Sequence, residues 1–158
     1  MADLDKNQML LSEVLQKVSN AKTKSKKIEI LKQLRTDALT SVLIWNYDSS
    51  VISMVPEGEV PFTPNDAPAG TEHTRLLQEY RNLYHFVKGG NDTLNRPTRE
   101  RMFVQMLEGL HADEASLICL IKDGNLQKKY KITKACVDEA YPDIPVSYTH
   151  LRAHETLL

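Results

Sequence analysis

The placement of proline and glycine limits what this chain can fold into more strongly than any other feature of its sequence. Four of the seven prolines and two of the six glycines fall in residues 56–70. On either side of that stretch, apolar residues recur every three to four positions, which is typical of amphipathic helices, and no segment sustains the alternation typical of a strand. The sequence therefore predicts an all-α fold, an irregular compact array of six to seven helices.

Seven segments have the apolar spacing of a helix that packs one face against a core. Side chains that cap helix N-termini precede most of them, and glycine or proline follows where several should end. The expected helices cover residues 9–18, 26–34, 38–45, 76–87, 97–110, 114–121 and 134–140, with caps at Ser25, Thr36 or Asp37, Asp113 and Thr133. Residues 51–55 are too short to assign to a strand or a helical turn, and residues 56–70 are expected to form a long loop.

Residues 1–145 are expected to form one helical domain, since about 145 residues can enclose a single core. The stretch VSYTHLRAHET, residues 146–156, resembles one reading frame of an adapter used in transposase-based sequencing libraries. We therefore expect residues 146–158 to be an artefactual, non-native tail, and the natural protein to end or be cut off near Pro145. The spacing of His150 and His154 in that tail carries no implication for metal binding.

Composition argues against membrane and secreted classes of protein. The chain has no apolar run near the roughly 20 residues that a membrane span needs, and its start lacks the basic and apolar regions of a signal peptide. Cys119 and Cys136 stand alone, without the CxxC spacing of redox or zinc sites. We therefore expect a cytoplasmic protein with reduced cysteines and no contact with a membrane.

The formal net charge of −1 hides two basic stretches. Residues 17–35 hold seven basic side chains and one acid, and residues 122–134 hold five basic side chains and one acid. Segregated charge can focus a positive field on one face of a protein that is neutral as a whole. The alternative is that each stretch is an ordinary solvated helix face.

These basic stretches contain the candidate binding residues. A helix N-terminus beside lysines is a natural phosphate site, so the expected cap Thr133 would place backbone amides next to the second stretch. Tyr130 has two interpretations, a phosphate contact or a buried side chain. Arg99 lies in a third basic group and would either contact phosphate or pair with neighbouring acids. The candidate nucleic-acid-binding residues are Lys24, Lys26, Lys27, Lys128, Lys129, Lys131, Thr133 and Arg99.

Catalytic, metal and cofactor motifs do not emerge from the sequence. The triplet Lys122-Asp123-Gly124 is similar to the Lys-x-Asp-Gly signature of nucleotidyl transferases but lacks the intervening residue, and a helix C-terminus explains it better. There is no GxxxxGK[ST] phosphate loop. His73, His85 and His111 are too far apart in sequence to suggest a metal site. The expectation is a protein that is not an enzyme and holds no cofactor, unless a catalytic domain followed residue 145.

Two stretches carry a resemblance to a known family. LSEVLQKVSNAKTKSKKIEILKQLRTDALTSVLIWNYDSSV (residues 11–51) and YKITKACVDEAYPDIP (residues 130–145) resemble the start and end of the helical N-terminal domain of T4-type ATP-dependent DNA ligases. The chain is also similar to short uncharacterised proteins of T4-like phages. The ligase resemblance implies backbone contacts to nicked duplex DNA through the six candidate lysines. It is weakest at residues 56–71, and Tyr130-Lys131-Ile132 replaces the ligases' small-residue turn.

Three functions follow as hypotheses. The first is a non-catalytic phage accessory protein that binds the backbone of duplex DNA, in the cytoplasm of an infected bacterial host. Phage replication or repair proteins would be its neighbours. The second is a helical protein-interaction module with no nucleic-acid role. The third is the N-terminal piece of a DNA ligase whose catalytic part is missing.

Overall fold

Seven α-helices and two 3₁₀ helices make up the part of the chain that the computed structural model describes, residues 9–48, 50–58, 60–63 and 74–142. This part contains no strand, only an isolated antiparallel bridge between Ser53 and Val87. The predicted all-α class is therefore confirmed. The predicted tail, residues 146–158, lies outside the described residues. The elements are α1 (Leu11–Asn20), α2 (Lys24–Gln33), α3 (Asp37–Tyr47), α4 (Leu76–Glu79), η1 (Tyr80–Phe86), α5 (Arg96–Gly109), α6 (Ala112–Ile121), η2 (Leu126–Lys128) and α7 (Lys134–Ala140).

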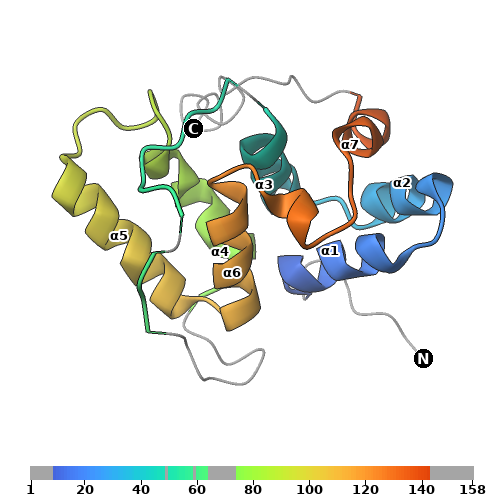
Figure 1. Ribbon diagram of the computed structural model, residues 1–158, viewed down its shortest axis with the longest axis horizontal. Coiled ribbons are helices and arrows are strands. Elements are labelled where there is room, and N and C mark those ends of the chain that lie inside the picture. The colour runs from blue at the N-terminus through green and yellow to red at the C-terminus, as the bar shows by residue number, and fades with distance from the viewer. Residues whose placement is uncertain (1–8, 49, 59, 64–73, 143–158) are drawn as a thin grey trace.

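The helices form two groups joined through α3 and α6. Figure 1 shows α1, α2 and α7 gathered at one end of the molecule and α5 at the other, with α3, α4 and α6 between them. Helix α7 packs mainly on α2, while α6 contacts α1, α3 and α5. As a result, the first helices of the chain and its last helix build the same end of the fold.

Side-chain caps start five of the seven α-helices. Thr36 caps α3 and Thr133 caps α7, as predicted, by accepting hydrogen bonds from Leu39 N at 3.1 Å and Cys136 N at 3.2 Å. Two predicted caps are wrong. Thr23, not Ser25, caps α2, and His111, not Asp113, caps α6 through its Nδ1, so each helix begins two residues earlier than predicted. In both cases another capping side chain stands two residues upstream. Asn95 caps α5, which has Pro97 in its first turn, where its missing N–H is not needed.

The predicted amphipathic helix 76–87 is mostly not α-helical. Only Leu76–Glu79 is α, and Tyr80–Phe86 winds as a 3₁₀ helix. The apolar residues Tyr80, Leu83 and Phe86 are spaced by three, and this period places them on one face of a 3₁₀ helix. The chain then leaves the helix to pair with residues 52–54, since Met54 N donates to Phe86 O at 2.7 Å.

A fully buried acid, Glu114 on α6, joins two helix starts in the described core. Glu114 has no exposed surface, and its two carboxylate oxygens accept hydrogen bonds from Leu11 N at 2.8 Å and Leu76 N at 3.1 Å. A single carboxylate on α6 therefore satisfies the free backbone amides at the starts of α1 and α4, where negative charge is favourable. The described core also contains fully buried apolar side chains, among them Leu15, Leu39, Leu43, Leu76, Leu83, Phe103, Leu107, Leu117 and Ile118.

Candidate nucleic-acid interface

The two predicted lysine groups adjoin in the structure. The Lys27 ammonium donates a hydrogen bond to the carbonyl oxygen of Lys131, and Lys131 N donates to Ser19 Oγ at 2.9 Å. Residues more than 100 positions apart in sequence therefore lie side by side at the end of the molecule built by α1, α2 and α7. We call the six side chains the lysine surface: Lys24, Lys26, Lys27, Lys128, Lys129 and Lys131.

The segment that carries Lys128–Lys131 is held from two sides. On the α3 side, Leu126 N donates to Asn46 Oδ1 at 3.0 Å, and the Tyr47 hydroxyl donates to the carbonyl of Ile132. On the α1 side, Ser19 accepts from Lys131 N. Because its backbone is tied at both ends, this short segment holds its lysines in a defined position although most of it is not helical.

Tyr130 anchors the same segment in the core. Its side chain is buried, and this burial, with a smaller contribution from Asp113, raises the pKa of its hydroxyl. The interpretation of Tyr130 as a buried side chain is therefore confirmed. The Lys129 ammonium lies over the Tyr130 ring, 5.5 Å from its centre, so the face of this anchoring ring also attracts an exposed cation.

The six ammonium groups differ in what they already bind. Lys24 forms an ion pair with Glu139 at 3.2 Å, and Lys27 donates to two backbone carbonyls, those of Ser19 and Lys131. Lys26, Lys128 and Lys131 are exposed, and within the described residues their side chains form no ion pair. The positive charge available to a ligand comes chiefly from these last three and from Lys129.

A hollow of about 550 Å³ borders the lysine surface between α1 and the segment that follows η2. Lys17 and Lys129 line it, together with the carboxylates of Glu13 and Asp113. Ser12 also lines it, and its buried hydroxyl has no hydrogen-bond partner in the part of the chain that the structure describes. Acids match the bases in this hollow, so it adds little positive potential to the lysine surface.

Thr133 and Arg99, the other two candidate residues, make hydrogen bonds within the fold. Thr133 is exposed beside Lys131, but its hydroxyl already accepts the hydrogen bond that caps α7. Arg99 is buried at 6% exposure, and its guanidinium donates to the carbonyls of His85, Asn91 and Leu94 at 2.9, 3.0 and 3.2 Å. These hydrogen bonds hold the turn before α5 in place. We therefore do not count Arg99 among the residues that could bind nucleic acid. Sequence gives no sign of this burial, because the neighbouring arginines look equivalent.

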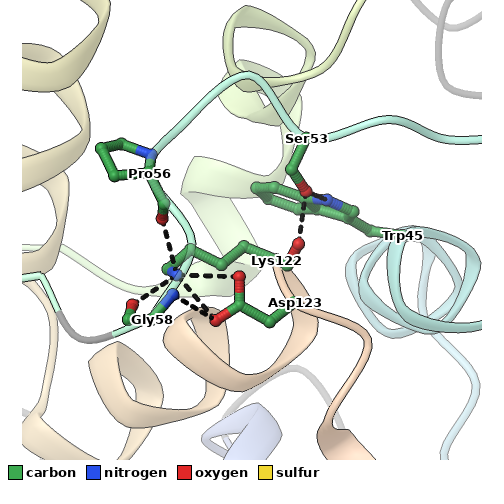
Figure 2. A network of polar contacts seen from close by, with 6 residues as sticks. All are labelled: Trp45, Ser53, Pro56, Gly58, Lys122 and Asp123. Atoms are coloured by element: carbon green, nitrogen blue, oxygen red, sulfur yellow. Dashed lines mark hydrogen bonds and ion pairs between the residues drawn. The ribbon is translucent and has the colours of Figure 1, made fainter.

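The Lys122-Asp123-Gly124 triplet forms a buried polar network (Figure 2). Lys122 is the C-cap residue of α6, and Gly124 follows with φ +70°, so the helix-end interpretation is confirmed. The Lys122 side chain has no exposed surface. Its ammonium donates to Pro56 O at 2.9 Å, to Gly58 O at 2.6 Å, and to Asp123 at 2.9 and 3.0 Å.

This network fixes the start of the 56–70 loop. Gly58 N donates back to Asp123 Oδ2 at 3.0 Å, and Ser53, which accepts from Trp45 Nε1 at 2.9 Å, donates to the Lys122 carbonyl. A lysine surrounded in this way is a structural cross-link between α6 and the loop. Sequence analysis missed this role, since only the long-range contacts reveal it.

Metal-binding geometry is not found in the described residues. No group of three or more His, Cys, Asp or Glu side chains there is arranged to hold a metal ion. His111 caps α6, and the His85 ring contacts the Asn91 amide at 3.0 Å. His73 lies outside the described residues. Among the described helices, none has the length and apolar character of a membrane span.

Comparison with known proteins identifies a family but no function. A model described as "Family of unknown function (DUF6433)" matches residues 14–128. The match includes the first lysine group and Lys128, whereas Lys129, Lys131 and α7 lie beyond it. No curated protein and no solved structure matches the chain.

Proposed function

The chain belongs to the family of unknown function DUF6433, and we propose that it binds the backbone of duplex DNA through the lysine surface, without catalysing a reaction. One observation carries the proposal: two basic segments from distant parts of the chain adjoin through Lys27, Lys131 and Ser19. A single basic stretch is an ordinary helix face, but two that meet produce a combined field.

The chemistry of the surface favours phosphate over bases. Lysine ammonium groups bind phosphate oxygens as mobile point charges, and the surface carries no described arginine fork or asparagine that would read base edges. Binding is therefore independent of sequence. It depends on the release of counterions, so the logarithm of the affinity falls by about 0.9 per phosphate neutralised for each unit of log salt concentration.

Fluorescence anisotropy with two labelled duplexes of unrelated sequence tests this proposal. The protein is titrated into each duplex at several salt concentrations. Equal affinities with a steep linear dependence on log salt support the proposal. Absence of binding at about 50 mM salt, or an affinity that salt does not change, overturns it.

The resemblances to T4-like phage proteins and to the ligase N-terminal domain extend the proposal. On this basis the protein acts in the cytoplasm of a phage-infected bacterium, beside replication or repair proteins, as a relative of the ligase N-terminal domain. A gene recovered without the adapter-like residues 146–158 tests this extension. A phage gene neighbourhood supports it. A Lys-x-Asp-Gly motif soon after Pro145 would instead identify the N-terminal piece of a ligase.

A protein-interaction module is the second candidate. Ile52 and Met54 are the exposed large hydrophobic residues of the described part, at 51% and 40% exposure. They flank Ser53 in the extended segment that pairs with residues 86–88, so both side chains sit on a strand-like edge. Affinity capture from infected cells, with and without nuclease, separates the candidates, because a partner retained after nuclease treatment does not depend on DNA.

A further inference from the structure

A second cationic site lies between the start of α3 and the α4–η1 segment and shares no residue with the lysine surface. It is a hollow of about 520 Å³ lined by three arginines, Arg35, Arg75 and Arg81. They come from the turn between α2 and α3, from the N-cap of α4 and from η1. Among the described residues that line the hollow, Asp37 is the one acid.

Aromatic rings position two of the three guanidinium groups. Arg35 lies over the Tyr141 ring at 4.9 Å from its centre, and Arg81 lies over the Tyr80 ring at 5.6 Å. The Arg81 Nε also donates to the Tyr80 hydroxyl at 3.3 Å. A guanidinium held over a ring is positioned before a ligand arrives, and a pre-positioned side chain loses less entropy when the ligand binds.

The positive charge of the hollow favours an anionic ligand. Three arginines and Asp37 give the described lining residues a formal charge of +2. A phosphate monoester carries about −1.5 to −2 near pH 7, and its oxygens match the planar fork of arginine. The start of α3, an eleven-residue helix, faces the same hollow through Asp37 and Ala38 and adds the positive end of its dipole. Leu77 and Tyr80 complete the wall and offer apolar surface to the organic part of such a ligand.

We propose that this arginine hollow binds the phosphate group of a phosphomonoester. The phosphate comes either from a free nucleotide-sized molecule or from the 5′ end of a nucleic-acid strand. The two sources share one chemistry, and the experiment below separates them. This binding does not depend on the lysine surface, so either proposal can fail without the other.

Isothermal titration calorimetry on the full chain tests the proposal with matched ligands. The probes are AMP against adenosine, and a short 5′-phosphorylated strand against its unphosphorylated twin. If the source is a free nucleotide-sized molecule, AMP is expected to bind and adenosine is not. If the source is a strand end, the 5′-phosphorylated strand is expected to bind more tightly than its unphosphorylated twin. Whichever pair shows the difference names the source. If neither pair differs, the proposal is overturned.

Two substitutions of opposite sign localise the effect. Arg81→Gln is expected to weaken phosphate-dependent binding by about tenfold, the loss expected for a charged hydrogen bond, and Asp37→Asn is expected to tighten it. Arg81 is fully exposed to solvent, so its loss should leave the far-UV circular dichroism unchanged. Arg101→Gln removes an exposed arginine outside the hollow and is the control. If Arg81→Gln and Arg101→Gln bind alike, the site lies elsewhere and the proposal fails.

Discussion

Replacing Lys122 by methionine removes the ammonium of a buried network while keeping most of the side-chain volume. Four hydrogen-bond contacts that the ammonium donates disappear: one to each of the carbonyls of Pro56 and Gly58, and two to the carboxylate of Asp123. The carboxylate then remains largely buried without its counter-charge. Removing one partner of a buried ion pair costs about 3–5 kcal/mol, chiefly through the charge left behind.

The expected loss lies at the lower end of that range. Asp123 keeps 12% exposure and the hydrogen bond from Gly58 N at 3.0 Å, so its charge stays partly solvated and hydrogen-bonded. We therefore expect a loss of about 3 kcal/mol in the free energy of unfolding. For a protein of this length, that is a fall of roughly 6–12 °C in melting temperature.

Urea unfolding followed by circular dichroism measures this loss. The midpoint should fall while the slope of the transition stays the same. Lys128→Met is the matched control, because Lys128 is exposed and an exposed substitution changes stability by roughly 0.5 kcal/mol or less. Adding Asp123→Asn to Lys122→Met should recover part of the loss. Equal midpoints for Lys122→Met and Lys128→Met would refute the reasoning.

Three further predictions concern the core and the pH dependence of stability. Glu114→Gln replaces one of two carboxylate acceptors by an amide donor and should lower the unfolding free energy by about 2 kcal/mol in the same urea assay; an unchanged midpoint would argue against its role at two helix starts. Gly90→Ala would place a Cβ 1.9 Å from the Tyr84 carbonyl oxygen, so the unfolding free energy is expected to fall by more than about 2 kcal/mol. Gly58→Ala is the comparison, with an expected loss of about 1 kcal/mol, because the space there is open and only φ +84° opposes the change. Burial raises the pKa of Tyr47 to about 12 from its ordinary value near 10, so the unfolded chain loses this proton first and stability falls as pH rises from 10 to 12. Thermal melts across that range should show a shallower fall for Tyr47→Phe, and parallel curves would contradict this.

Local signals in the sequence predict much of the fold. Thr36, Pro97 and Thr133 act at helix starts where capping chemistry and proline geometry place them. The wrong caps, Ser25 and Asp113, each have a competing side chain two residues upstream. Choosing between such neighbours depends on tertiary packing, which a one-dimensional pattern does not contain.

Long-range contacts account for what sequence analysis missed. Glu114 looks like an ordinary polar residue on α6, but it bonds to amides 103 and 38 positions away. Arg99 and Lys122 look like surface cations but are buried, and they donate to carbonyls 5–14 and 64–66 positions away, respectively. The charge of the basic stretches is readable from sequence, but whether they meet is decided by the packing of α7 on α2. The arginine hollow is unreadable for the same reason, since its three guanidinium groups come from separate segments.

The most direct test of the lysine surface removes one lysine from each of its two groups. Lys26→Gln with Lys128→Gln is compared with Lys88→Gln and Arg101→Gln, which remove two exposed cations outside the surface. The measurement is the slope of log affinity for duplex DNA against log salt concentration. If both lysines contact phosphate, the first double variant should have a slope shallower by about 1.8, and the second should match the unmodified chain. Equal slopes for the two double variants would contradict the account.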